Sequence, residues 1–297
     1  MNWLVSLQEF IEEQNASFTT DRIRDNRIST LEREALIRRA KSLKARNAVI
    51  VNAQVKAKIL NHDSPASNIE EVTYLIKRSY LIKQPSNFYV EESLERRKAL
   101  IENNEIELDQ SIEQEGLFQS KLPTVERDED VMSMPRYKYN RLEAVKYAER
   151  WWNSHNPAYK LFENDCTNFI SQCLHSGGAP MRGYPSRSKG WWYRNNNWSY
   201  SWAVANTLRW HLSGSKQGLR GQEMPSAGQL VPGDVICYDF NGDGRWQHNT
   251  IVVARDEQGM PLVNAHTHNS RMRYWDYTDS TAYTPEIRYK FFRIIDG

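Results

Sequence analysis

Three long runs of β-branched and other apolar residues dominate the first third of the sequence. They span residues 48–60, 71–82 and 88–101. The turn signal Asn-His-Asp-Ser-Pro separates the first run from the second. Runs of this composition with turn residues between them predict consecutive antiparallel strands. A chain that carries them must build a sheet and bury at least one of its faces.

Two helices are predicted before these strands. Apolar residues recur at helical spacing over 2–14, and Ser29 with Glu32 forms a capping box at the start of a second helix. Helices followed by long strands predict an α+β domain whose curved sheet wraps a helix, a cystatin-like or nuclear-transport-factor-like shape. No cluster of His, Cys and acidic residues occurs here, which favours a binding or scaffolding role for this accessory domain.

Length and charge predict two domains. The 297 residues exceed the usual single domain. Residues 1–130 hold 19 basic and 23 acidic residues, whereas 131–297 hold 20 and 14, and nine of the ten Trp follow position 150. An acidic, Pro-bounded stretch lies between the two halves. We therefore predict an N-terminal domain at 1–122, a linker at 123–136 and a second domain at 137–297.

Composition also excludes several classes of protein. A net charge of +2 gives no strong attraction to nucleic acid or to a membrane surface, and no apolar run is long enough for a membrane span. Three cysteines are too few and too irregularly spaced for a disulfide framework or a zinc site. The first ten residues resemble no secretory signal, which predicts a cytoplasmic protein. A leader removed ahead of this sequence would instead make it secreted or cell-wall-associated.

The segment 164–178 is the most informative for chemistry. It reads Asn-Asp-Cys-Thr-Asn-Phe-Ile-Ser-Gln-Cys-Leu-His-Ser-Gly-Gly, with apolar residues at helical spacing and a Gly-Gly stop. Asp165 is the expected N-cap, so Cys166 falls in the first turn. A helix N-terminus lowers the pKa of a thiol, and its free amides can hold an oxyanion. Cys173 and Cys237 fit core positions instead.

A thiolate nucleophile needs a base, and three predicted strands supply candidates. Pro-Gly-Asp leads into a strand at 235–240, Asn-Gly-Asp-Gly leads into a second strand that starts near His248, and a third covers 262–267. Asn264 and His266 share one face of the third strand by its two-residue period. Either residue could orient the imidazole of His248 through its second nitrogen.

Together these segments resemble the putative amidase domain family, a branch of the NlpC/P60-type papain-like cysteine hydrolases. Asp-Cys-Thr-Asn-Phe-x-Ser-Gln at 165–172, the Pro-Gly-Asp strand and a His at a strand start match in order, and the likeness spans about residues 137–297. The resemblance implies an α+β, papain-like domain in which a helix-borne Cys packs on an antiparallel sheet. It implies Cys166 as nucleophile, His248 as base and Asn264, or alternatively His266, as third residue. Tyr159, with Asp165 beside the nucleophile, is the candidate for completing the oxyanion hole.

The predicted function is therefore cysteine-dependent amide hydrolysis through a thioester acyl-enzyme, with peptidoglycan stem peptides of a bacterium as a candidate substrate. The alternative is a catalytically inactive module of the same fold that binds peptide or glycan. No nucleic-acid partner and no cofactor are expected, and the sequence leaves the oligomeric state open.

Aromatic and charged residues of the second domain carry further alternatives. Five tryptophans could stack on a substrate, or form an aromatic core under a long loop: Trp191, Trp192, Trp198, Trp202 and Trp246. Arg182, Arg187, Lys189, Arg194 and Arg209 could attract an acidic substrate, although a solvated basic face is the favoured interpretation. The loop 239–244 matches half of a calcium-binding loop, but Thr250 stands where the bidentate Glu belongs, so we predict a plain turn and no metal.

Overall fold

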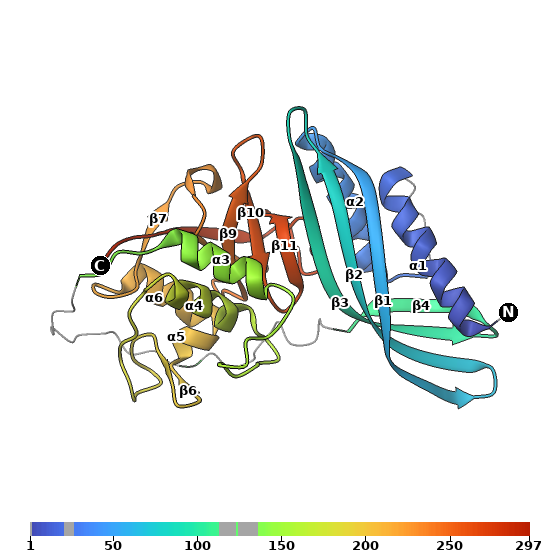
Figure 1. Ribbon diagram of the computed structural model, residues 1–297, viewed down its shortest axis with the longest axis horizontal. Coiled ribbons are helices and arrows are strands. Elements are labelled where there is room, and N and C mark those ends of the chain that lie inside the picture. The colour runs from blue at the N-terminus through green and yellow to red at the C-terminus, as the bar shows by residue number, and fades with distance from the viewer. Residues whose placement is uncertain (1, 21–26, 113–122, 124–135) are drawn as a thin grey trace. The chain divides into compact units, whose positions relative to one another are not determined.

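The computed structural model describes residues 2–20, 27–112, 123 and 136–297, and the chain divides into two compact units (Figure 1). The first unit contains Met1–Glu115 together with Asp276–Tyr283, and the second contains Gly116–Trp275 and Thr284–Gly297. Apart from Pro123 and Arg136, the predicted linker lies outside the described residues. Both units combine helices with antiparallel strands, as the α+β prediction expected.

The first unit is a pair of helices on an antiparallel meander. The helices are α1 (Trp3–Thr20) and α2 (Thr30–Ala45), and the strands are β1 (Val49–Ala66), β2 (Ile69–Lys83), β3 (Phe88–Glu102) and β4 (Glu105–Ser111). Each strand pairs with the next along the chain. Ser29 caps α2 in the predicted capping box. The sequence thus predicted every one of these elements except β4.

One face of this sheet is buried under the helices. Along β2 every second residue from Val72 to Ile82 is buried, the two-residue period of a strand with one covered face. Leu7, Phe10 and Ile11 of α1 pack into the same core as Val72 and Ile76. The period also places two charged residues on the covered face, since Arg78 and Arg97 are buried as deeply as their apolar neighbours.

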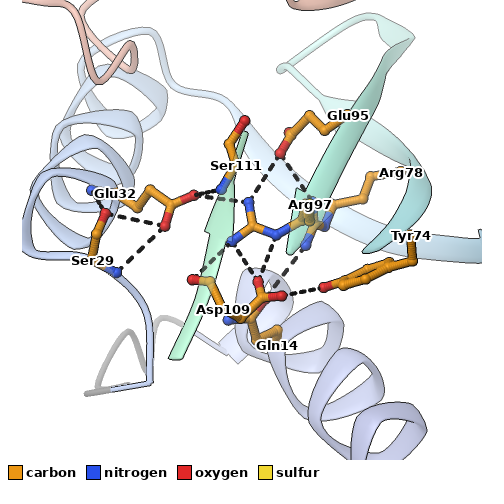
Figure 2. A network of polar contacts seen from close by, with 9 residues as sticks. All are labelled: Gln14, Ser29, Glu32, Tyr74, Arg78, Glu95, Arg97, Asp109 and Ser111. Atoms are coloured by element: carbon orange, nitrogen blue, oxygen red, sulfur yellow. Dashed lines mark hydrogen bonds and ion pairs between the residues drawn. The ribbon is translucent and has the colours of Figure 1, made fainter. Parts of the chain in front are cut away.

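A network of ionic contacts satisfies the charge of Arg97 (Figure 2). Arg97 donates through Nε to Asp109 Oδ1 at 2.6 Å and through Nη1 to Glu32 Oε1 at 2.8 Å and Glu95 Oε2 at 3.2 Å. Tyr74 donates its hydroxyl to the second oxygen of Asp109 at 2.5 Å. Glu32 is also the acidic partner of the capping box, so the network fixes the start of α2 against β3 and β4.

Eight residues from late in the sequence complete the first unit. Arg38 on α2 donates through Nε to the carbonyl of Thr278 at 2.7 Å and through Nη2 to the carbonyl of Ser280 at 2.9 Å. Its guanidinium also lies over the ring of Tyr283, and Arg39 pairs with Asp279 at 3.6 Å. The segment between β11 and β12 therefore belongs to the N-terminal unit by its contacts.

The second unit carries its helices on one face of a separate run of strands. Its helices are α3 (Arg141–Trp151), α4 (Cys166–Ser176), α5 (Tyr200–Ala203) and α6 (Ala205–Gly214), with a 3-10 turn at Ala227–Gln229. Its strands are β5 (Tyr193–Arg194), β6 (Asn197–Trp198), β7 (Gly221–Met224), β8 (Val235–Asp239), β9 (His248–Arg255), β10 (Pro261–Ala265), β11 (Asn269–Tyr274) and β12 (Arg288–Ile294). β5 and β6 form a small hairpin, and the others run in the order β11-β10-β9-β8-β12-β7 with antiparallel neighbours.

The two faces of this second sheet have different neighbours. Cys237 and Ile251 belong to the core that α3, α4 and α6 cover. Tyr238, one residue along β8, instead meets the ring of Tyr289 on β12 at 5.7 Å between centroids. Because successive side chains of a strand point to opposite faces, this alternation decides which polar residues of β8 and β9 face the helix that carries Cys166.

Candidate functional site

Cys166 is the first residue of α4, as the sequence predicted. All nine residues from Cys166 to Leu174 are buried, and the helix ends at Gly177. Asp165 occupies the N-cap position but makes no capping bond to the first turn. Its Oδ1 accepts instead from Asn168 Nδ2 at 2.8 Å and from the amide of Phe162 at 3.2 Å. The predicted cap is therefore correct in position and wrong in its hydrogen bonding.

The other polar side chains of the motif anchor the helix. Thr167 accepts from Asn249 Nδ2 at 3.0 Å, Asn168 from Trp202 Nε1 at 2.8 Å, Ser171 from Trp191 Nε1 at 2.9 Å and Gln172 from Tyr147 at 2.6 Å. Each of these bonds joins α4 to a different segment of the unit. Buried polar groups that are satisfied in this way fix one arrangement of a helix. The motif spacing thus has a structural cause at every position except Cys166.

The Cys166 thiol has weak contacts by comparison. The side chain is 4% exposed, and Sγ lies 3.6 Å from Thr167 Oγ1. Burial raises the pKa of this thiol, against the lowering effects of the Thr167 hydroxyl and the backbone amide of Asn249. We predicted that the helix N-terminus would lower this pKa, and that prediction is wrong because the cost of burying a thiolate is the larger effect. The resting residue is a neutral thiol.

A polar contact joins Asp165, the residue before Cys166, to the turn after β10. His266 Nδ1 is 2.7 Å from Asp165 Oδ2, and Nε2 is 2.8 Å from the carbonyl oxygen of Trp151. The imidazole stacks on Phe169, one turn along α4, at 4.0 Å and 9°. A carbonyl oxygen only accepts, so Nε2 is the donor in the contact with Trp151, and Nδ1 faces the Asp165 carboxyl group. The sequence offered His266 only as an alternative third residue, and the structure places it at the start of the helix.

His248 has a different environment. It is the first residue of β9 and stands opposite Tyr238 on β8. Its ring lies 5.6 Å from that of Tyr238 and 6.3 Å from that of Phe240. Asn249, the next residue, points its side chain to Thr167 of α4, so His248 faces the other side of the sheet. Burial lowers the pKa of His248 to about 3, with further lowering by His268 and Arg273.

Asn264 and Tyr159 contact other segments of the second unit. Asn264 donates through Nδ2 to Glu149 Oε1 at 2.8 Å and accepts from the amide of Met272 at 2.9 Å. Tyr159 stacks on Trp202 with 5.8 Å between centroids. The structure thus joins His266 to Asp165, the residue before Cys166, while His248, Asn264 and Tyr159 have other neighbours.

Most of the predicted tryptophan strip is core. Trp191, Trp192, Trp202 and Trp246 are 0%, 1%, 0% and 7% exposed, which favours the packing alternative over contact with a substrate. Trp198 is half-buried and differs from them. The amine of Lys160 and the guanidinium of Arg187 lie 4.9 and 4.7 Å from its ring centroid, and Phe162 meets its edge. Trp198 therefore retains the exposure that recognition requires.

The loop 239–244 forms tight local hydrogen bonds. The amide of Gly244 donates to Asp239 Oδ2 at 2.7 Å, and both Gly242 and Gly244 have positive φ, at 68° and 88°. Thr250 bonds to Tyr238 on the sheet. In the described parts of the chain, no three His, Cys, Asp or Glu side chains are grouped so that they could hold a metal ion. No helix among the same residues has both the length and the apolar character to cross a membrane.

Fold and site together define an α+β protein with a cysteine at the start of a buried helix. Residues 138–292 match the model of the family described as "Putative amidase domain", and the chain belongs to this family. It is 49% identical over 270 residues to the uncharacterized protein YhbB of Bacillus subtilis (strain 168), a match that covers 87% of this chain and 85% of that protein.

A second relative is more distant. The uncharacterized protein YjcM of the same organism is 29% identical over 140 residues, 44% of this chain and 31% of that protein. No solved structure matches the chain. At the coarse level, the family description indicates amide hydrolysis.

Proposed function

We propose that the second unit is a cysteine-dependent amide hydrolase in which Cys166 is the nucleophile. One observation supports this most strongly. Cys166 is the position in the motif 165–172 whose polar atom has no strong anchoring bond, while its polar neighbours are held by bonds of 2.6–3.0 Å. A residue that contributes little to packing or anchoring at the centre of such a motif fits a chemical role.

We assign the base to His266, oriented by Asp165. A nucleophile, an imidazole and a carboxylate that fixes the imidazole form the set that acyl transfer needs. The ring would exchange its bond to the Trp151 carbonyl for one to the Cys166 thiol and keep its bond to Asp165. This assignment revises the base implied by the family resemblance, because His248 faces away from α4 and its lowered pKa makes it a poor proton acceptor.

The proposed reaction has two stages. His266 first releases to solvent the Nε2 proton that it donates to Trp151, which leaves a neutral imidazole with its proton on Nδ1. Cys166 Sγ then attacks the amide carbonyl and forms a C–S bond, while the thiol proton passes to Nε2. The tetrahedral intermediate collapses, the C–N bond breaks, and the imidazolium protonates the leaving amine. Water then attacks the thioester, with the same imidazole as base, and releases the acid and the thiol. The amide of Asn249, which acts on the sulfur, and the first-turn amides of α4 are the candidate oxyanion donors.

The substrate class and finer fold are part of the same proposal. A peptide, including a peptidoglycan stem peptide, offers the amide, and Trp198 with its cationic neighbours is the proposed contact. Helix α4 packed on an antiparallel sheet is compatible with a papain-like, NlpC/P60-type arrangement. For the first unit we retain a cystatin-like or nuclear-transport-factor-like comparison and a binding role.

The test is hydrolysis of soluble peptidoglycan fragments by the full chain, with Cys166→Ala, His266→Ala and His248→Ala. We expect Cys166→Ala to reduce kcat/KM by at least about 1,000-fold and His266→Ala by at least about 100-fold. Cys173→Ala and His175→Ala, on the same helix, are the matched controls and should retain activity. Full activity of Cys166→Ala would refute the nucleophile, and a larger loss in His248→Ala than in His266→Ala would return the base to His248.

A binding module is the second candidate, and the burial of Cys166 favours it. A buried neutral thiol is the environment of an inert structural cysteine. In that case the wild type and Cys166→Ala would bind the same fragments with equal affinity, and no thioester adduct of Cys166 would be seen by mass spectrometry. Detection of that adduct would decide for the enzyme.

A further inference from the structure

Arg209 is a buried cation with an unusual environment. It lies on α6 and is only 8% exposed. Its guanidinium carbon is 3.8 Å from the ring centroid of Trp210 and 5.3 Å from that of Trp246. Nε and Nη1 are buried, and neither donates to an acceptor in the described residues. An arginine is almost never buried in this way without a partner for its charge.

Other buried arginines have polar partners, although Nε of the buried Arg78 has none in the described part of the chain and its other nitrogens contact Gln14 and Glu95. Arg97, 4% exposed, donates to three carboxylates, and Arg141 pairs with the buried Asp234. Stacking between aromatic rings stabilises a guanidinium, but it leaves the N–H donors, which lie in the plane of the guanidinium, unused. Unmet donors of a buried charge cost more than those of a neutral group. Arg209 therefore has donor capacity that folding alone does not explain.

Arg209 and Cys166 are connected through one residue of β8. Cys237 stands opposite Asn249 in the β8–β9 pairing, and Asn249 donates to Thr167 beside Cys166. The charge of Arg209 lowers the pKa of Cys237 and the Cys166 sulfur raises it, although burial is the largest effect on this thiol. The geometry agrees, because Trp246, whose ring lies 5.3 Å from the Arg209 guanidinium carbon, stands three residues before Asn249 and belongs to the same helix-covered core as Cys237.

We propose that Arg209 binds a carboxylate of the substrate, so that the preferred substrate is an acidic peptide with a carboxylate near the amide that is cleaved. This inference rests on the proposed function. A guanidinium binds a carboxylate through charge-assisted N–H donors, and Nε and Nη1 of Arg209 both have donor capacity that the described residues do not use. Trp210, 54% exposed, stacks on the cation and links it to the surface.

Binding is tested separately from hydrolysis. The full chain with Cys166→Ala is titrated by calorimetry with N-acetyl-alanyl-glutamic acid and with the diamide of the same dipeptide. We expect the acid to bind at least tenfold more tightly than the diamide. Adding Arg209→Gln should reduce this preference to less than threefold, whereas Arg245→Gln, an exposed arginine beside Trp246, should leave it unchanged.

Equal affinities for acid and diamide in the protein that retains Arg209 would overturn the proposal, and this comparison does not depend on how a variant folds. Loss of the preference in Arg245→Gln as well as in Arg209→Gln would also overturn it, because a diffuse basic surface would then explain the binding. Arg209→Lys keeps the charge without the paired donors and should give an intermediate preference.

Turnover distinguishes this inference from the proposed function. If the acid binds through Arg209 but the wild type cleaves neither acidic nor neutral peptides, the hydrolase proposal fails and the carboxylate site stands. If the wild type cleaves both peptides equally and Arg209→Gln is fully active, the carboxylate site fails and the hydrolase stands.

Discussion

One buried charge network of the first unit and two buried groups of the second differ in how fully they are bonded. In the first unit, Arg97 is satisfied by Asp109, Glu32 and Glu95, and Asp109 in turn accepts from Tyr74. In the second unit, the Cys166 thiol has one weak side-chain contact, and two donors of Arg209 are buried without an acceptor in the described residues.

The difference separates stability from function. A fully bonded network fixes how helices and strands meet, and it leaves no capacity to bind anything else. Groups that remain under-bonded in a well-packed core are tolerated where they serve binding or chemistry. On this comparison, the Arg97 network of the first unit serves architecture, whereas the second unit keeps Cys166 and Arg209 available.

The largest expected effect concerns the Arg97 network of the first unit. Arg97→Met should destabilise the protein by about 3–5 kcal/mol, because it leaves the buried Asp109 without its cation. The measurement is denaturant unfolding followed by circular dichroism. Arg97→Met with Asp109→Leu removes both charges and should be less destabilised than the single variant. A single variant as stable as the wild type would show that the network does not stabilise the first unit.

The next effect concerns a buried histidine of the second unit. Burial lowers the pKa of His211 to about 4, and its Nε2 has no hydrogen-bond partner in the described residues. The unfolded chain takes up a proton near pH 6.5 and the folded chain does so only near pH 4, so stability falls as pH falls through this window. The loss is about 3 kcal/mol. Between pH 7 and pH 4, the free energy of unfolding should fall less steeply for His211→Gln than for the wild type.

A third prediction concerns the reactivity of the resting thiol. The pKa of Cys166 is raised and the thiolate is the reactive form, so alkylation by iodoacetamide should be more than tenfold slower than for a free thiol at pH 8. The rate should still be rising above pH 9. Mass spectrometry of the modified peptide gives the rate at this site. A plateau below pH 7 would instead reveal a preformed thiolate–imidazolium pair and remove the contrast between the two units.

The smallest effect tests the edge of the ionic network. Ser29→Ala removes the side chain that caps α2 and should cost about 1 kcal/mol. Thr19→Ala, which removes an exposed hydroxyl bonded within α1, is the control and should change stability by less than about 0.5 kcal/mol. Equal losses of stability in the two variants would show that the Ser29 cap does not stabilise α2 more than an ordinary exposed hydroxyl stabilises α1.

Local patterns predicted most of the elements. The apolar run at 71–82 predicted the strand β2, and Ser29 with Glu32 marked the start of α2. The Gly-Gly pair marked the end of α4. These features depend on a few neighbouring residues, so the sequence contains all the information that they need.

The parts that escaped prediction depend on contacts between distant segments. Asp165 and His266 are 101 residues apart, and no local pattern pairs them. The face of His248 is set by a single step along β9, because a strand reverses its side chains at every residue. The burial of Cys166 has the same origin, since the layers that cover α4 come from several segments. Helix position alone therefore gave the wrong direction for its pKa.

Residues 276–283 have a consequence for how the protein is made. The contacts of Arg38 and Arg39 with Thr278, Ser280 and Asp279 can form only after about 240 further residues have been synthesised. At ribosomal rates, the 171 residues between 112 and 283 take roughly 10 to 35 s. During that interval the nascent N-terminal meander lacks its last segment. Translation rate and early chaperone contact should therefore affect the yield of this protein more than that of one whose first domain is contiguous.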